Sequence, residues 1–475
     1  MHIFLDETKK RSFTKQIYIE IRKKILSGEL EAGQSLPSSR DLSRELCVAR
    51  NTVLTAYDML VSEGAVYSVV GSGFYISSDV KYEPHSISVG DQQTASLSDY
   101  TIMERTINFD SGVPALDLFP RQKWNRAVSR AFLDAPVSAL GYDDPQGRPE
   151  FRSILCDYLK KTRGISCRPD QIIVTAGTKQ GLSLAAKCLL HSKSEVWMEN
   201  PSNANVKKIF SYYTDKITPF EVDDQGLQPN QFPVRGKPTL IFTTPSHQFP
   251  MGGILPIKRR VELIQFAKNS GAYLLEDDYD SEFGYDALPS NSLFELDCEH
   301  VIYTGTFSKV LFPSVRLGYL VVPLCLVPQM RELKRLSDHH SNSAYQLALM
   351  RFIENGDLER HIRRMKKEYK NRRDCLIELL SIYFGEHVRI HGTAAGMHVV
   401  AEFEDTVFTE ERIRRLLQAG VYVVPVENHS LIKGSHSNQI ILGYAGLTRD
   451  AMVRGLDLIK TELSADNKVY KLTSV

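Results

Sequence analysis

A lysine placed directly after a predicted buried strand is the first residue with evident chemistry. The segment Thr304-Gly305-Thr306-Phe307-Ser308-Lys309 sets the amine of Lys309 among hydroxyl groups, and Arg316 follows seven residues later. An amine can form an imine with a carbonyl compound, and a guanidinium can grip an anion through two hydrogen bonds. A single lysine is most often a solvated surface residue, so the neighbouring hydroxyls and arginine are what make this segment a candidate site.

A run of acidic residues ends a second predicted strand. Residues Glu276-Asp277-Asp278-Tyr279-Asp280 follow the apolar stretch Ala272–Leu275. Four acids in five residues cannot all be buried at low cost unless a positive charge lies among them. A protonated ring nitrogen of a bound cofactor would supply that charge. An acidic loop facing solvent is the alternative when the motif is taken alone.

A third segment has the pattern of an anion-binding turn. Val174-Thr175-Ala176-Gly177-Thr178-Lys179-Gln180 reads as a strand that passes through glycine into a helix. Free backbone N–H groups at such a helix start can hold an anion. The pattern is weak evidence alone, and its order relative to the lysine and acidic segments strengthens it.

Together these segments resemble the cofactor site of fold-type I aminotransferases, which bind pyridoxal 5'-phosphate (PLP). The resemblance implies that Lys309 forms the Schiff base and that Asp277 pairs with the pyridine nitrogen, with Asp278 as the alternative. It assigns Tyr279 to the phenolic oxygen. It implies that the phosphate is bound by Gly177, Thr178, Lys179, Thr306, Ser308 and Arg316. The site contains no predicted metal.

A further loop points to a dimer. Gly141-Tyr142-Asp143-Asp144-Pro145-Gln146-Gly147 resembles the aminotransferase loop whose tyrosine reaches the phosphate bound by the partner subunit. By that resemblance Tyr142 belongs to the cofactor site of a second copy. We therefore expect a homodimer with shared sites.

The elements that must position these residues follow an alternating order. From Ile107 onward, short apolar runs alternate with amphipathic helical stretches. The apolar runs predicted as strands are residues 171–175, 195–198, 239–243, 272–276 and 301–304. Such alternation predicts an α/β domain with a largely parallel sheet.

The first 78 residues have a different pattern of predicted elements, with short helices followed by two strands. A predicted helix over Lys15–Ser27 precedes a helix that Ser38 caps, and a third helix carries Val53, Ala56, Tyr57 and Leu60 at i, i+3, i+4 and i+7. That face must be core. Two alternating strands then flank Gly71-Ser72-Gly73, a turn able to form a hairpin.

This region resembles the GntR-type winged helix along its whole length. The matching segments are Leu36–Leu42, Val48–Val53, Ala56–Leu60, Glu63-Gly64 and Gly71–Phe74. The resemblance implies that DNA phosphates and major-groove base edges meet Ser39, Arg40, Arg50, Asn51 and Thr52. Gly71 would let the wing backbone approach the minor groove. Ala49 is a departure, because the family often has Ser or Thr there.

Composition narrows the class of protein. The chain has 475 residues, 42% hydrophobic and 24% charged, which favours a globular protein of two to four domains. No apolar run approaches the roughly 20 residues of a membrane span. Seven scattered cysteines without a C-x-x-C pair argue against disulfides or zinc and favour the cytoplasm. The net charge of +1 gives no sign of a polyanionic partner.

The order of all segments identifies the chain as a member of the MocR/GabR group of regulators. We expect a winged helix-turn-helix at 1–78, a linker at 79–106 and an aminotransferase-like PLP domain at 107–475. The expected partners are double-stranded operator DNA, a second copy of the chain and a small-molecule effector. The competing hypotheses are an active aminotransferase with an appended DNA-binding head and a DNA-binding dimer whose body is only a scaffold.

Two departures from the family bear on the effector. After the strand near Glu199, many relatives carry an aromatic residue, and the member that senses γ-aminobutyrate carries an arginine two residues later. This chain has Asn203 and Asn205 at those positions. The late arginine that binds a substrate α-carboxylate in aminotransferases aligns with Ile441. An amino-acid carboxylate would therefore lack its guanidinium, unless Arg389 or the partner chain compensates. We expect PLP itself to be the effector, with a larger amine, such as a dipeptide, as the alternative.

Overall fold

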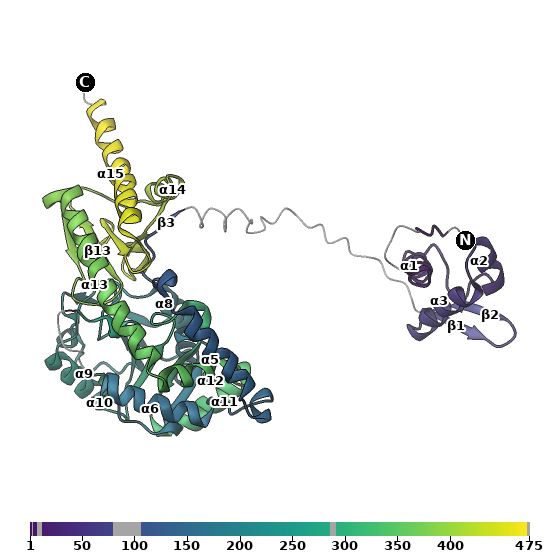
Figure 1. Cartoon of the computed structure of the whole chain (residues 1–475), viewed down its shortest axis with the longest axis horizontal. Coiled ribbons are helices and arrows are strands. Elements are labelled where there is room, and N and C mark those ends of the chain that lie inside the picture. The colour runs from purple at the N-terminus through teal and green to yellow at the C-terminus, as the bar shows by residue number, and fades with distance from the viewer. Residues whose placement is uncertain (2, 7–11, 79–105, 286–290, 473–475) are drawn as a thin grey trace. The chain divides into compact units, whose positions relative to one another are not determined.

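The computed structural model describes residues 1, 3–6, 12–78, 106–285 and 291–472 (Figure 1). The chain divides into two compact units, Met1–Ser96 and Leu97–Val475. The predicted linker, apart from Thr106, lies outside the described residues. Across the described residues, no helix is both long and apolar enough to cross a membrane.

The first unit is a three-helix bundle with a hairpin. Its elements are α1 (Phe13–Leu26), α2 (Ser39–Glu45), α3 (Arg50–Ser62), β1 (Val66–Val69) and β2 (Gly73–Ile76). The predicted apolar faces of α1 and α3 pack together in one core, which also includes Leu42 of α2. The two strands pair antiparallel from Val66 opposite Ile76 to Val69 opposite Gly73. The winged helix-turn-helix predicted from the sequence is confirmed.

The second unit is built on an eight-stranded sheet in the order β4-β11-β10-β9-β8-β5-β6-β7. Neighbouring strands from β10 to β6 are parallel, whereas β11 and β7 run antiparallel to their neighbours. All five strands predicted from the sequence lie in this sheet. The strands are β4 (Ile172–Thr175), β5 (Val196–Asn200), β6 (Ile217–Asp223), β7 (Gly226–Leu227), β8 (Leu240–Thr243), β9 (Tyr273–Asp278), β10 (Val301–Thr306) and β11 (Gly318–Val321).

Both faces of this sheet are buried. Along β9, Leu274 belongs to one hydrophobic cluster and Leu275 to another, and Tyr303 and Ile302 of β10 divide in the same way. Successive side chains of a strand point to opposite faces, so helices must cover both. The helices around the sheet are α5 (Arg121–Leu133), α6 (Pro149–Arg163), α7 (Thr178–Leu189), α8 (Ala204–Ser211), α9 (Ile257–Ser270), α10 (Leu293–Leu296), α11 (Val327–Asp338) and α12 (Ser343–Glu354).

A smaller antiparallel sheet follows in the chain, in the order β12-β13-β16-β15. The long helix α13 (Asp357–Phe384) leads into it, as the green ribbon of Figure 1 shows. Its remaining elements are β12 (Val388–His391), β13 (His398–Phe403), α14 (Glu410–Gln418), β14 (Val421–Tyr422), β15 (Val424–Pro425), β16 (Gln439–Gly443) and α15 (Arg449–Leu472), with β3 (Ile107–Asn108) paired to β14. The predicted α/β class with a mostly parallel large sheet is confirmed.

Candidate cofactor site and nucleic-acid interface

Lys309 lies three residues beyond the end of β10, in a partly buried position. Its Nζ donates a hydrogen bond to the backbone oxygen of Gly112, at 2.8 Å. A Cβ atom at position 112 would come within 2.7 Å of that Nζ, so any larger residue there would require the end of the Lys309 side chain to shift. Burial lowers the pKa of Lys309, while Asp110, Asp280 and Asp277 oppose that change. An amine whose charged form is disfavoured in this way is a better nucleophile than a solvated lysine.

The two aspartates that the sequence left as alternatives have different surroundings at the end of β9. Asp278 is occupied: its Oδ2 accepts from Arg163 Nε at 2.8 Å, from Tyr303 Oη at 2.6 Å and from Ser281 Oγ at 2.6 Å. Asp277 Oδ1 is buried and has no hydrogen-bond partner among the described residues. Burial, together with the negative charge of the neighbouring Asp278, raises the pKa of Asp277 to about 8. A cationic N–H would satisfy this carboxyl, and Asp277 is therefore the one available to a pyridine ring.

Tyr279 shares its environment with a histidine to which we assigned no role from the sequence. Its hydroxyl lies 3.0 Å from both His247 Nδ1 and His247 O, and burial raises its pKa well above 10. His247 Nδ1 is also 3.1 Å from Asp280. The other ring nitrogen, Nε2, is buried without a partner in the described chain, as is Nδ1 of nearby His398. His247 thus holds the tyrosine that is expected to meet the cofactor.

A usable signal for His247 existed in the sequence. The segment Thr244–Pro250 directly follows β8, the strand that pairs in parallel with β9. Parallel neighbours end at the same edge of a sheet, so residues after β8 must lie beside those after β9.

The predicted phosphate ligands gather at the start of α7. Gly177 precedes this helix with φ 103°, and a Cβ there would lie 3.3 Å from Arg316 Nη1. Thr306 Oγ1 donates to Ser308 Oγ at 3.0 Å, and Thr306 pairs with Gly318, whose own Cβ would lie 2.9 Å from Gly177 Cα. Among the described residues, the Arg316 guanidinium forms neither a hydrogen bond nor an ion pair. A helix start, two hydroxyls and a free guanidinium suit a phosphate.

For three other predicted cofactor residues, the structure gives a position but no contact that indicates cofactor binding. Thr178 is the first residue of α7, and Lys179 beside it is exposed but close enough for its charge to lower the pKa of Lys309. Tyr142 is 86% exposed, with its ring 4.7 Å from that of His339. A single chain does not test its predicted contact with a partner's phosphate.

In the described part of the chain, Arg389 does not replace the arginines that relatives carry near this site. Ile441 is 1% exposed and packs with Val400 and Val426 in an apolar cluster, against which Phe249 and Met251 lie. Arg389, the residue considered as a substitute, is exposed and paired with Glu404 at 3.0 Å. Asn205 is exposed, and Asn203 accepts its backbone N–H as the cap of α8.

The predicted DNA-reading side chains lie around the starts of α2 and α3. Arg40, Arg50 and Asn51 are exposed, and Thr52 is half-buried. Ser39 is only 8% exposed, and its Oγ accepts from Arg50 Nε at 3.1 Å. In this unit, Ser39 therefore fixes the guanidinium of Arg50.

Two backbone features suit contact with DNA. Ala49 stands at the N-cap of α3 and makes no side-chain cap hydrogen bond, so its own side chain leaves the positive end of this helix open to an anion. Gly71 lies exposed at the hairpin turn with φ 78°, a conformation that favours glycine.

Comparison with known families agrees with both halves of this description. Residues 13–76 match the family described as "Bacterial regulatory proteins, gntR family", and residues 104–459 match "Aminotransferase class I and II".

Relatives match the chain over nearly its full length. It is 32% identical to the "Probable rhizopine catabolism regulatory protein MocR" of Rhizobium meliloti, over 95% of this chain and 94% of the relative. It is 30% identical to the "HTH-type pyridoxine biosynthesis transcriptional regulator PdxR" of Corynebacterium glutamicum, over 95% and 96%. Among solved structures, the α-aminoadipate aminotransferase LysN of Thermus thermophilus, complexed with N-(5'-phosphopyridoxyl)-L-leucine, is similar with a TM-score of 0.71 and 25% identity, over 78% of this chain and 95% of LysN.

Proposed function

Since this chain belongs to the MocR-type regulators, which join a gntR-family winged helix to an aminotransferase class I and II domain, we propose that its signal is the supply of PLP. The protein is a DNA-binding transcription regulator whose aminotransferase-like domain binds PLP. Occupancy of that domain would control operator binding. A regulated gene in PLP synthesis fits the 30% identity to a relative named as a pyridoxine biosynthesis regulator.

The residues around Lys309 would divide the work of holding the cofactor. When bound, PLP supplies an aldehyde carbon that can join an amine, and a ring that withdraws electrons from it. The amine of Lys309 would take that carbon, the carboxyl of Asp277 would keep the ring nitrogen protonated, and Tyr279 would donate to the phenolic oxygen. Arg316, with the hydroxyls beside it and the start of α7, would bind the phosphate.

The observation that carries the proposal is a contrast within this one site. Among the described residues, the Asp277 Oδ1 and the Arg316 guanidinium have no partner, and PLP would satisfy both. The position aligned with the substrate-carboxylate arginine is instead Ile441, in an apolar cluster. Desolvating a carboxylate against that cluster without a charged partner is unfavourable by roughly 2 kcal/mol or more. The ligand best provided for is therefore the cofactor itself.

The proposal includes a homodimer. Tyr142 is 86% exposed and carries no hydrogen bond within the described chain, as expected of a residue that completes a site in a second copy. A dimer would present two winged helices to two half-sites. A change in their arrangement on PLP binding would shift the spacing that they can engage.

The decisive experiment is operator binding by the apoprotein, with the operator selected from random DNA. We expect addition of PLP to change the affinity at least tenfold, and a subsequent panel of amino acids to add little. If PLP leaves DNA binding unchanged while one amino acid shifts it strongly, the signal is that amino acid and the proposal is wrong.

A further inference from the structure

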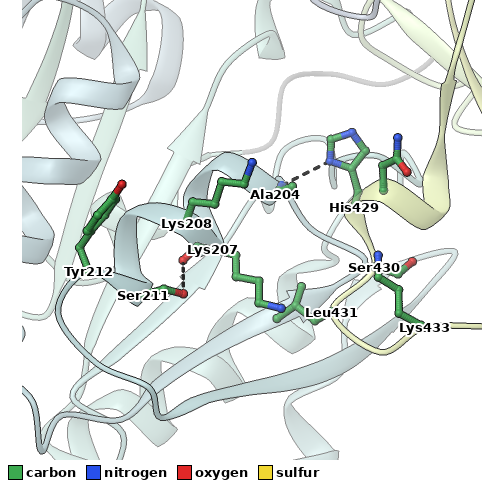
Figure 2. Close-up of a pocket in the computed structure, with 10 residues that line it drawn as sticks. Ala204, Lys207, Lys208, Ser211, Tyr212, His429, Ser430, Leu431 and Lys433 are labelled. Atoms are coloured by element: carbon green, nitrogen blue, oxygen red, sulfur yellow. Dashed lines mark hydrogen bonds between the residues drawn. The ribbon is translucent and has the colours of Figure 1, made fainter. Parts of the chain in front are cut away.

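A second pocket lies beside the cofactor site: the ring of His429 in its wall is 5.0 Å from that of Phe249, which is 5.9 Å from the ring of Tyr279. Its volume is about 480 Å³, and it opens between α8 and the loop at residues 428–433 (Figure 2). No residue assigned to the cofactor lines it. Pockets of this size hold small organic molecules, and junctions between different parts of a fold are common places for them.

The charge lining this pocket is positive. Lys207 and Lys208 of α8 and Lys433 of the loop line it, and no aspartate or glutamate does. In the described part of the chain, the ammonium groups of Lys207 and Lys208 form no ion pair. Lys433 Nζ donates to the backbone oxygen of Glu427 at 2.6 Å. The two lysine side chains leave α8 in different directions, and each exposed ammonium group attracts an anion in the pocket from its own side (Figure 2).

The carboxylate on the same loop is already used. Glu427 accepts backbone N–H groups from Gly434 at 2.7 Å and from His436 at 3.1 Å. Its charge therefore shapes the loop. It does not pair with the lysines of α8.

A buried hydroxyl in the wall provides an independent indication of a ligand. Ser430 is 5% exposed, lines the pocket, and its Oγ has no hydrogen-bond partner among the described residues. Leaving such a group unpaired is unfavourable, and native proteins rarely do so. Because the Oγ itself has almost no accessible surface, the side chain must turn about its Cα–Cβ bond to donate to a ligand oxygen in the pocket.

The wall that carries Ser430 is fixed before any ligand arrives. His429 Nδ1 accepts from Ala204 N at 3.3 Å, and His429 O accepts from Ser202 N at 3.0 Å. Asn200 Oδ1 accepts from Leu431 N at 2.6 Å. These bonds join the loop to the end of β5 and the start of α8. A pocket ordered in this way requires little conformational entropy loss on binding.

We propose that this pocket binds a small organic anion with phosphate or carboxylate groups, as a second ligand beside the cofactor. Lys207 and Lys208 hold the anionic group, and the Ser430 hydroxyl donates to one of its oxygens. The Tyr212 ring and Leu431 provide apolar contact for the rest of the molecule. A ligand in this site would give the regulator an input in addition to PLP.

The test uses the full-length protein with PLP fixed in place by borohydride, so that the cofactor's phosphate site is filled. Calorimetric titration with inorganic phosphate and, separately, with succinate should give saturable binding of one anion per chain at this pocket. The Lys207→Ala/Lys208→Ala variant should weaken it at least tenfold, and Ser430→Ala about fivefold. The tighter probe identifies the class: phosphate for phosphate esters, succinate for carboxylates.

The matched control is Lys367→Ala/Lys370→Ala, which removes the same charge from exposed positions of α13. It should bind both probes like the unmodified protein. The proposal is overturned if neither probe binds saturably up to about 10 mM, or if the α8 double variant binds like this control. Because PLP is already fixed, neither outcome depends on whether PLP is the signal.

Discussion

The two units hold their functional groups in opposite ways. In the winged helix, Arg40, Arg50 and Asn51 are exposed within twelve residues of sequence, and water already solvates them. In the aminotransferase-like unit, Asp277 is buried, and the half-buried Tyr279 is held by His247, 32 residues earlier in the chain. Exposed groups can be changed one by one at modest cost, whereas buried groups depend on one another. Substitutions should therefore have graded effects in the first unit and large effects in the second.

The largest effect is expected at Lys309. Lys309→Ala removes the only amine that we place at the cofactor's aldehyde, so covalent attachment should be lost completely while PLP can still bind through the phosphate ligands. Borohydride reduction followed by peptide mass spectrometry measures this directly. The control is Lys187→Ala, at an exposed position of α7 with no assigned role, which should keep the modification at Lys309. Finding the reduced cofactor at another lysine in the unmodified protein would contradict the assignment.

A large pH effect is expected from Asp277 in the apoprotein. Because its pKa is raised to about 8 in the folded state, from 3.8, the folded protein binds the extra proton between these values. The free energy of unfolding should then fall as the pH rises through that window, by about 1 kcal/mol per pH unit. Asp277→Asn should remove this contribution, and PLP should reduce it. Urea denaturation at pH 5, 6.5 and 8 tests both, and an unchanged slope in the variant would contradict the assigned burial.

Substituting arginine for Ile441 should test whether this apolar position faces the ligand. Ile441→Arg places an unpaired charge in the cluster with Val400 and Val426, and should lower the free energy of unfolding by about 3 kcal/mol. An amino acid whose carboxylate pairs with the new guanidinium should restore part of that loss. Thermal unfolding with and without glutamate measures it, with Ile441→Leu as the control. If the two variants respond alike, the position does not face the ligand.

The winged helix should show smaller and separable effects. Arg50→Ala should weaken binding to the selected operator by about 1–3 kcal/mol if its side chain reads a base, with little change on random DNA. Arg40→Ala should weaken both kinds of DNA alike, as loss of a phosphate contact does. Gel-shift titrations at two salt concentrations separate these cases. Wild-type affinity in both variants would remove these residues from the interface.

The sequence predicted those parts of both units that depend on local pattern. The buried face of α3 followed from its helical spacing, and the five strands of the large sheet followed from their apolar runs. The shared edge of those strands also made the meeting of Lys309 with Asp277 predictable.

Contacts between distant segments could not be predicted. The second pocket depends on Asn200 bonding to Leu431, 231 residues away, and on Ala204 bonding to His429. The spacing of apolar residues along the sequence does not indicate hydrogen bonds between segments so far apart. The difference between Asp277 and Asp278 likewise depends on Arg163, which lies 115 residues earlier than Asp278.

The smallest expected effect concerns Ser39, for which the sequence predicted contact with DNA. Its burial and its bond to Arg50 Nε indicate that it acts by holding the guanidinium. Ser39→Ala should weaken operator binding by about 0.5–1.5 kcal/mol, the usual contribution of one hydrogen bond. In an Arg50→Ala background the same substitution should have almost no effect, because there is no guanidinium left to position. A double-mutant cycle measures this coupling. Additive losses would instead mean that the Ser39 hydroxyl contacts DNA itself, and that the buried, interdependent arrangement is confined to the cofactor-binding unit.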